Sequence, residues 1–328
     1  MTAGARSATL FVGMSRSSLH RSRPLQIALA ALALSACGQS RGVFDPADMP
    51  GATGAAGTTG ALQSCDGFPM PNPARVGLPN PAKYTRNADG TITDDVTGLT
   101  WDGRVEDVGL SEQDGAAQCA AKGEGWRLPT RLELVSLVDY TVPAPGPTID
   151  AIFEGTPGAI FWTSSIYAGD VGDAWTVGFD AGYSDYGLRE TLERVRCVRP
   201  PPAEVRCRPT RFETRQAEGV VRDLATGLTW EHTLDTTRMF TWDESAARCA
   251  ARGPGWRVPS LTELQTIIDD AREYPAIDES IFPGTPRVVF WTSTPHAESV
   301  GTAWYVDFFY GATDADVRTR AYQVRCVR

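Results

Sequence analysis

Residues 125–130 read Gly-Trp-Arg-Leu-Pro-Thr, and residues 255–260 repeat this stretch as Gly-Trp-Arg-Val-Pro-Ser. Each stretch follows a cysteine, Cys119 or Cys249, that lies in a helical run of small residues. A glutamate stands three residues after Thr130 and again three residues after Ser260, which is the pattern of a capping box at a helix N-terminus. The stretch therefore predicts a junction between two helices, and it predicts that junction twice.

The surrounding sequence is duplicated as well. Thr97–Trp101 reads Thr-Gly-Leu-Thr-Trp and returns at Thr226–Trp230 with an offset of 129 residues. Phe161–Ser164 reads Phe-Trp-Thr-Ser and returns at Phe290–Ser293 with the same offset. A repeat of this length indicates two globular domains rather than a solenoid of short units. We expect domains at 65–199 and 207–328, joined by a proline-rich linker at 200–206 that neither helix nor central strand tolerates.

The local patterns of each copy predict the α+β class, with two helices packed against short antiparallel strands. A hairpin is expected from Tyr84 to Trp101, turning at Asn87–Gly90. The apolar periodicity after the capping box predicts a second helix over 131–140, and over 261–271 in the second copy. The other elements expected in the first copy are a helix over 113–122 and strands over 160–163, 174–179 and 195–199, with loops rich in Gly, Asp and Tyr between the strands.

The first segment predicts export. Three arginines precede an apolar run, Leu25–Ala36, that is too short to span a bilayer and has the shape of a signal peptide. The run ends Leu-Ser-Ala-Cys37, which resembles the bacterial lipobox. That resemblance implies a signal peptide at 1–36 and an acylated Cys37 that holds the protein on a lipid bilayer. The alternatives are an ordinary cleaved signal with a chance cysteine, and a start at Met14 rather than Met1.

Residues 37–64 are rich in Gly, Ala and Thr and are expected to form a flexible tether. In diderm bacteria, an aspartate after the lipidated cysteine is the pattern for retention in the inner membrane. Gly38 follows Cys37 instead, so we expect the protein to be located at the outer membrane. The formal net charge of −9 argues against nucleic acid as a partner.

The chain has 7 cysteines, an odd number, which fits three pairs and the lipidated Cys37. An exported chain oxidises its thiols, and the duplication predicts the equivalent pairs Cys119–Cys197 and Cys249–Cys326. Cys65 and Cys207 remain, and a bridge between them is the simplest completion. No Cys-x-x-Cys motif occurs, and only two histidines follow Cys37, so we expect no metal and no other cofactor.

At these residues the chain resembles the domain named for the C-terminal part of the Legionella collagen-like protein, the Lcl C-terminal domain. The matching pattern is Asp-x-x-Thr-Gly-Leu-x-Trp, Ala-x-x-Cys, Gly-Trp-Arg-Leu-Pro-Thr-x-x-Glu-Leu, Phe-Trp-Thr-Ser, Ala-Trp and Val-Arg-Cys-Val-Arg. It covers roughly residues 84–199 and 212–328. The arrangement of helix, disulfide and last strand also resembles C-type-lectin-like folds, but neither copy has the Glu-Pro-Asn or Trp-Asn-Asp motifs of calcium-dependent lectins. The resemblance implies a binding or scaffolding module rather than a catalyst.

Two sets of repeated residues are expected to be structural. Trp101, Trp126, Trp162 and Trp175 recur as Trp230, Trp256, Trp291 and Trp304, and a shared fold needs a shared core. Arg127 and Arg257 are expected to join hydrogen-bond or ion-pair networks, and the alternative is recognition of a phosphate or carboxylate ligand.

The variable loops are the predicted ligand-binding regions, because exposed tyrosines beside carboxylates suit sugar stacking and hydroxyl hydrogen bonding. The candidates are Tyr167, Asp180, Tyr183, Asp185 and Tyr186 in the first copy, and His296, Asp307, Tyr310, Asp314 and Asp316 in the second. No catalytic arrangement recurs, since His296 aligns with Tyr167, and we expect no enzyme activity. The expected function is adhesion through an extracellular glycan or other polymer, and the alternative is a subunit that binds another envelope protein.

Overall fold

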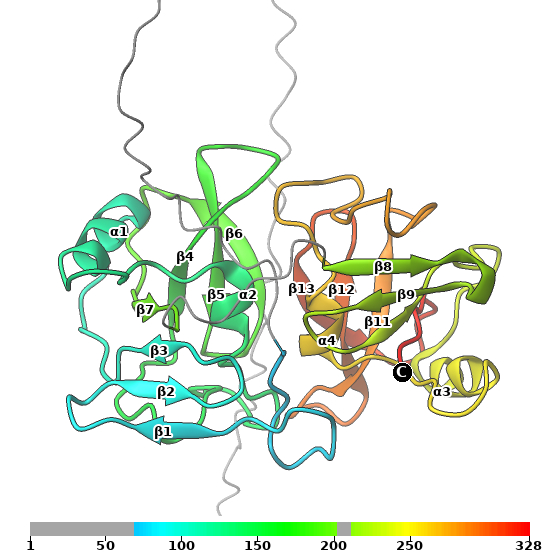
Figure 1. The fold of residues 1–328 in the computed structure, drawn as a ribbon, viewed down its shortest axis with the longest axis horizontal. Helices are drawn as coiled ribbons and strands as arrows, with labels where there is room; N and C mark the ends of the chain where they lie inside the picture. The colour runs from blue at the N-terminus through cyan, green and yellow to red at the C-terminus, as the bar shows by residue number, and fades with distance from the viewer. Residues whose placement is uncertain (1–68, 202–210) are drawn as a thin grey trace, which may run out of the picture. The chain divides into compact units, whose positions relative to one another are not determined.

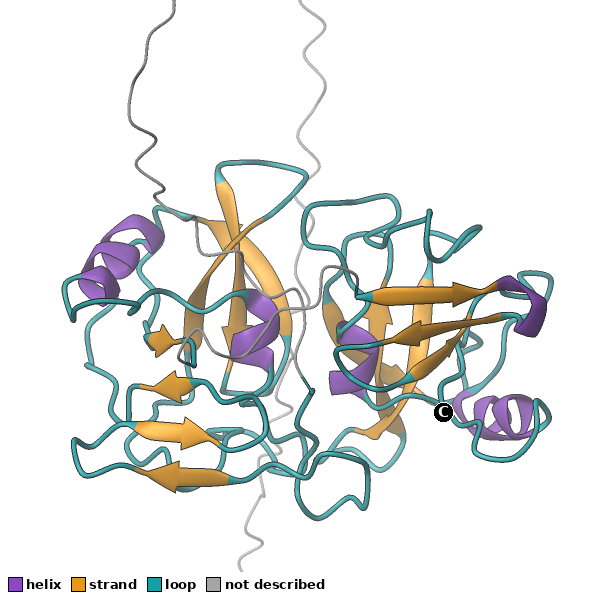
Figure 2. Ribbon diagram, viewed as in Figure 1, coloured by secondary structure: helices purple, strands orange, loops and turns teal. Residues whose placement is uncertain are grey.

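Each copy builds two small antiparallel sheets and two short helices (Figure 1; Figure 2). The computed structural model describes residues 69–201 and 211–328. The predicted signal peptide at 1–36, Cys37, the tether at 37–64, Cys65, Cys207 and most of the linker at 200–206 lie outside the described residues. For the rest of the chain, the predicted mixture of helices and short antiparallel strands is confirmed.

The first copy has a four-stranded sheet in the order β1-β2-β3-β7 and a three-stranded sheet in the order β4-β5-β6. The predicted hairpin is present, with Tyr84 opposite Asp94 and Arg86 opposite Ile92. Helix α2 packs against β4 and β5. The bounds are β1 Tyr84–Arg86, β2 Ile92–Asp94, β3 Thr100–Trp101, α1 Glu112–Ala120, α2 Arg131–Val135, β4 Ile160–Ile166, β5 Asp173–Gly178, β6 Ser184–Leu188 and β7 Val198–Arg199.

The second copy follows the same plan, with sheets in the order β10-β9-β8 and β11-β12-β13. Helix α4 packs against β11 and β12, as α2 does against β4 and β5. The bounds are β8 Phe212–Arg215, a 3-10 turn at Gln216–Glu218, β9 Val220–Asp223, β10 Thr229–Glu231, α3 Trp242–Ala250, α4 Leu261–Gln265, β11 Val289–Pro295, β12 Thr302–Asp307 and β13 Thr313–Val317.

Both predicted capping boxes are present, and both predicted second helices are too long. Thr130 and Ser260 accept hydrogen bonds from the main-chain N–H groups of Glu133 and Glu263, whose side chains bond back to the cap residues. Helix α2 ends at Val135, because Ser136 turns its hydroxyl back to the Glu133 carbonyl oxygen at 2.6 Å. Thr266 ends α4 in the same way, bonding to the Glu263 carbonyl oxygen at 2.7 Å.

Two disulfides fasten the first helix of each copy to its last strand region, as the duplication predicted. Cys119 is bonded to Cys197 and Cys249 to Cys326. The described residues belong to one compact unit, and one apolar core contains side chains from both copies. The predicted core role of the tryptophans is confirmed for the seven that are buried, namely Trp101, Trp162, Trp175, Trp230, Trp256, Trp291 and Trp304. Trp126 is half-buried beneath the Arg199 guanidinium.

The repeated arginines serve the fold, which confirms their predicted structural role. Arg127 donates two hydrogen bonds of 2.7 Å to the Glu133 carboxylate, which also accepts from the Thr130 main chain. Arg257 and Glu263 form the same bidentate pair at 2.6 and 2.7 Å. Each glutamate therefore joins the Gly-Trp-Arg segment to the helix that follows it.

Candidate functional site

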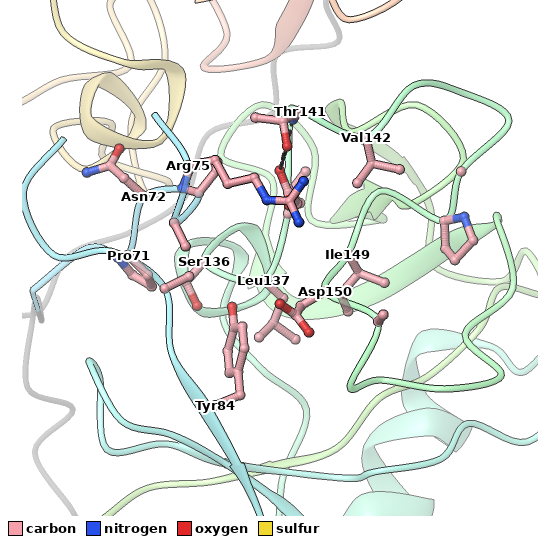
Figure 3. Close-up of a pocket in the computed structure, with 18 of the residues that line it drawn as sticks. Pro71, Asn72, Arg75, Tyr84, Ser136, Leu137, Thr141, Val142, Ile149 and Asp150 are labelled. Carbon is pink, nitrogen blue, oxygen red and sulfur yellow. Dashed lines mark hydrogen bonds between the residues drawn. The ribbon is translucent and has the colours of Figure 1, made fainter. Parts of the chain in front are cut away.

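The first copy contains a cavity of about 560 Å³ (Figure 3). Three segments form its wall: the loop at 71–75, the start of β1 at Tyr84, and the chain that runs from Ser136 through Asp150 after α2 ends. The chain that follows the early end of α2 therefore supplies much of the wall. A volume of this size suits a small molecule or one segment of a polymer.

The loop that forms the outer wall is held in place by Asn72, which is 1% exposed. Its side-chain amide donates to the Pro79 carbonyl oxygen at 2.8 Å, and its main-chain oxygen accepts from Ala82 at 2.7 Å. Its side-chain oxygen accepts hydrogen bonds from the hydroxyl groups of Ser260 and Thr262 in the second copy, at 2.8 and 2.9 Å. The second copy thus fixes one wall of the first copy's cavity.

Two aspartates offer hydrogen-bond acceptors to the cavity. Oδ1 of Asp139 accepts from the main chain and hydroxyl of Thr141, and Oδ1 of Asp150 accepts from the main chain of Ile152 at 2.8 Å. The second oxygen of each carboxylate accepts no hydrogen bond from the described residues. Arg75 extends over the same space from the outer loop, as Figure 3 shows, and is the one basic side chain among the wall residues.

Tyr84 supplies a donor and an aromatic surface. Its ring meets Phe153 edge to face at 5.1 Å, and its hydroxyl points into the cavity (Figure 3). Burial raises the pKa of Tyr84 well above its ordinary value, and the nearby carboxylates of Asp94, Asp150 and Asp139 raise it further. The hydroxyl therefore stays protonated at physiological pH and can donate a hydrogen bond to a ligand.

In the second copy, Arg211 stands at the position equivalent to Lys83 and forms an internal ion pair. The guanidinium donates to Asp223 Oδ2 at 2.8 Å and to the Thr266 carbonyl oxygen at 2.7 Å. Phe212 packs edge to face on Phe282 at 5.5 Å, as Tyr84 packs on Phe153. Of the residues that Arg211 contacts, only Thr266 has a counterpart in the cavity wall, which is Ser136.

In the first copy the counterparts are Lys83, Asp94 and Ser136. Lys83 pairs instead with Asp95 at 3.3 Å, and its side chain is 77% exposed. Oδ1 of Asp94 accepts from the main chain of Val96 at 2.9 Å, whereas Oδ2 is buried and has no partner. Burial raises the pKa of Asp94 above its ordinary value. Asp94 is not among the residues that line the cavity.

Three of the sequence-predicted tyrosines come together away from the cavity. Tyr167 and Tyr186 stack with ring centroids 3.8 Å apart, and Tyr310 of the second copy lies 6.3 Å from Tyr186. The Tyr167 hydroxyl bonds to Glu273, also of the second copy, at 3.0 Å. The expectation that Tyr167 is exposed is wrong, since its exposed fraction is 5%. It is buried because this cluster joins the two copies.

Several other predicted residues lie on strands rather than in loops. Asp185 is on β6, Asp314 and Asp316 are on β13, and Asp307 ends β12. Their segments are rich in Asp and Gly, which are depleted in strands, but pairing with β5 and β12 prevails over that preference. Burial raises the pKa values of Asp307 and Asp314. Asp316 accepts a hydrogen bond of 2.5 Å from the Tyr322 hydroxyl.

The remaining candidates are scattered. Asp180 and Tyr183 lie in the turn between β5 and β6, where burial raises the pKa of Tyr183 to about 12. His296 stacks on Trp304 with centroids 5.3 Å apart. None of the sequence-predicted ligand-binding residues lines the cavity. The sequence analysis missed Tyr84, Asp139 and Asp150. The one available signal of a difference between the copies was that Lys83 stands in the first hairpin where Arg211 stands in the second.

Within residues 69–201 and 211–328, no group of three or more His, Cys, Asp or Glu side chains is arranged to hold a metal ion. No helix in the described part of the chain is both long and apolar enough to cross a membrane.

The fold and the cavity define a duplicated, disulfide-clamped α+β protein with a ligand-sized hollow in its first copy. The sequence matches the Lcl C-terminal domain twice, over residues 90–199 and 219–328, and these matches cover more than half of the chain. The chain therefore belongs to the Lcl C-terminal domain family, with two tandem copies of the domain. A comparison with curated proteins finds no match.

Proposed function

We propose that the protein is a non-catalytic, lipid-anchored protein of the bacterial cell envelope, held at the outer membrane through Cys37. Its first copy takes a segment of an extracellular glycan, or of a similar hydroxyl-rich polymer, into the cavity. Its biological role would be adhesion. We further propose that each copy is a distant relative of C-type-lectin-like folds, which use a disulfide-clamped frame of this kind to present binding surfaces.

The observation that carries the proposal is the composition of the cavity wall. Tyr84 offers one hydroxyl donor, and Asp139 and Asp150 each offer one unused carboxylate oxygen. Sugars present hydroxyl donors and acceptors on flat apolar rings, and sites for small ligands combine a few such polar groups with apolar walls. Pro71, Pro73 and Pro143 supply much of that apolar wall.

One observation favours the alternative of a subunit that binds another envelope protein. Val171 and Leu188 are 78% and 62% exposed in the first copy, and their counterparts Val300 and Val317 are 90% and 45% exposed in the second. Exposed apolar pairs at equivalent positions in both copies are suited to protein contacts. Crosslinking in the native envelope tests this alternative, and recovery of one stoichiometric protein without any sugar binding would support it.

The test of the main proposal is a glycan array probed with the full mature protein, followed by titration of the best ligand. Asp150→Asn is expected to weaken that binding about tenfold, because it removes one charged acceptor worth roughly 1.4 kcal/mol. Asp170→Asn is the matched control, since Asp170 is also exposed and also caps a main-chain N–H two residues on, at 2.8 Å. Equal weakening by both variants, or no glycan bound at all, would contradict the proposal. Peptide mapping that finds Cys37 without an acyl chain would contradict the proposed lipid anchor.

A further inference from the structure

The polar groups of the cavity wall differ in whether they donate or accept hydrogen bonds. Oδ1 of Asp139 is bonded to the main chain and hydroxyl of Thr141, and Oδ1 of Asp150 to the main chain of Ile152. An ionised carboxylate has no proton to donate, so the second oxygen of each aspartate can only accept. The Tyr84 hydroxyl, which points into the cavity (Figure 3), can donate. A ligand that satisfies this wall must therefore carry at least two hydrogen-bond donors.

We propose that the cavity takes a neutral sugar unit and that Asp139 and Asp150 exclude acidic sugars. This inference rests on the proposed glycan function and names the class of glycan: a polymer whose bound unit carries hydroxyl groups but no carboxylate, sulfate or phosphate. Two hydroxyls of the sugar donate to the free oxygens of the aspartates, and a third oxygen of the sugar accepts from Tyr84.

The main chain holds the two aspartates as neighbours. Val138 and Ile149 face each other in an antiparallel bridge, and the N–H of Asp139 donates to the Thr148 carbonyl oxygen at 2.9 Å. Asp139 and Asp150 each follow one residue of this bridge, so they are diagonal neighbours across it. Diagonal neighbours in an antiparallel pair have Cα atoms about 7–8 Å apart. This spacing lets the hydroxyl groups of one sugar ring approach both carboxylates.

The charges of the wall disfavour an acidic ligand. Asp139 and Asp150 are the two acidic residues that line the cavity and Arg75 is the one basic residue, which leaves a formal charge of −1. A ligand carboxylate would bring a further negative charge to acceptors that have no proton to share, and like charges repel. Arg75 is exposed on the outer loop, where water weakens its attraction for an anion.

A cationic ligand would use less of the wall than a neutral sugar does. An ammonium could pair with one aspartate, but Arg75 extends over the same space and repels it (Figure 3). Asp139 is half-buried and Asp150 is exposed, and ion pairs formed at such positions contribute little. Hydroxyl donors need no counter-charge, and the proline side chains of the wall cover the apolar faces of a sugar ring. The wall therefore favours a neutral sugar over an amino sugar or a basic peptide.

The test is calorimetric titration of the full mature protein with oligosaccharides of equal length. The neutral probes are oligomers of glucose, mannose and galactose. Each is compared with the uronate oligomer that differs from it only by the carboxylate, and a glucosamine oligomer is the cationic probe. A mildly acidic buffer keeps the uronates ionised and the glucosamine protonated. The best neutral oligomer is expected to bind about tenfold more tightly than its uronate, and more tightly than the glucosamine oligomer.

A double variant locates this selection at the two aspartates. Asp139→Asn together with Asp150→Asn keeps an oxygen acceptor at each position, and asparagine forms the same kind of turn, so the variant is expected to fold. It removes both negative charges and adds two amide donors. Binding of the neutral oligomer is expected to weaken and binding of its uronate to strengthen, so the ratio of the two affinities falls to about one. A structural defect would weaken both oligomers equally and leave the ratio unchanged.

The matched control removes two negative charges from equivalent turns outside the cavity. Asp170 accepts from the main chain of Gly172 at 2.8 Å, as Asp150 does from Ile152. Asp235 accepts from the main chain and hydroxyl of Thr237, as Asp139 does from Thr141. Asp170→Asn together with Asp235→Asn is therefore expected to keep the wild-type ratio. A ratio that falls equally in this control would reveal general repulsion by an acidic protein and overturn the inference.

The remaining outcomes separate this inference from the proposed function. A uronate that binds as tightly as its neutral counterpart would overturn the exclusion of acidic sugars and leave glycan binding standing. Tightest binding of the glucosamine oligomer would likewise overturn it, because ion pairing would then outweigh hydroxyl recognition. Binding of none of these probes would overturn the inference, while the glycan array would still decide the broader proposal.

Discussion

At the scale of single residues, Asp94 and Asp223 are the same aspartate of the repeat in two electrostatic environments. Each is fully buried, and each uses Oδ1 to accept main-chain hydrogen bonds from the turn that follows. They differ in their ion partner: Arg211 donates to both oxygens of Asp223, whereas Oδ2 of Asp94 has no hydrogen-bond partner among the described residues. The same substitution at the two positions is therefore expected to have opposite effects.

Asp94→Asn is expected to stabilise the protein at neutral pH by about 1 kcal/mol, because it removes a buried charge that has no ion partner among the described residues. The folded-state pKa of Asp94 lies above its ordinary value of 3.8. The contribution of protonated Asp94 to the free energy of unfolding is therefore complete below pH 3.8. It is lost as the pH rises through the raised folded-state pKa. Urea unfolding at a series of pH values checks this, and a variant less stable than the wild type at pH 7 would contradict it.

Asp223→Asn is expected to destabilise the protein by about 3 kcal/mol, because it leaves the Arg211 guanidinium largely buried without its ion partner. The same urea unfolding experiment measures it. An effect equal in sign and size to that of Asp94→Asn would show that the two sites are electrostatically alike, contrary to the structure.

At the scale of elements, the starts of the helices could be predicted and their ends could not. A capping box needs only two residues three positions apart, here Thr130 and Glu133, so local sequence determines it. The end of α2 depends on Ser136 turning back to the helix and on Asp139 bonding to Thr148, a residue further along the chain. The cavity could not be foreseen from local sequence, because its wall combines three separate segments of the chain.

Strands β6 and β13 were missed because their stability comes from tertiary pairing. Ser184 and Thr313 are both buried, and the Ser184 main-chain N–H donates to the Thr313 hydroxyl at 2.8 Å. A segment with Asp and Gly on such a strand resembles a loop in sequence, because its strand partners are not local.

The two equivalent caps, Thr130 and Ser260, are expected to differ in their importance. Thr130→Ala removes one capping hydrogen bond and should cost about 1 kcal/mol. Ser260→Ala should cost more, because the Ser260 hydroxyl is buried and also donates to Asn72, at 2.8 Å, in the cavity wall. Urea unfolding of both variants measures this, and only Ser260→Ala should weaken ligand binding. A larger loss in Thr130→Ala would contradict the role assigned to Asn72.

At the scale of the whole molecule, the duplication and the disulfides were predictable, and the contact between the copies was not. Equal spacings in the repeat gave the pairs Cys119–Cys197 and Cys249–Cys326. By contrast, Arg131 is 1% exposed and pairs with Asp270 of the second copy at 2.6 Å, yet its counterpart in the repeat is Leu261. Contacts between copies break the symmetry of the repeat, so comparing the copies does not reveal them.

The contact between the copies supports the outer wall of the first copy's cavity. The first copy's outer wall is bonded through Asn72 to Ser260 and Thr262 of the second copy. In the second copy, Arg211 instead bonds to Asp223 and to the Thr266 carbonyl oxygen. We propose that the two copies have diverged into a binding copy and a copy that supports it.

The most direct test of that division is hydrogen–deuterium exchange of the full mature protein with and without a bound glycan oligomer. The account predicts slower exchange at 71–84 and 136–151, around the cavity, and no change at the equivalent segments 211–223 and 266–281. Equal slowing in both copies, or slowing confined to the strands that carry Asp185 and Asp314, would contradict it.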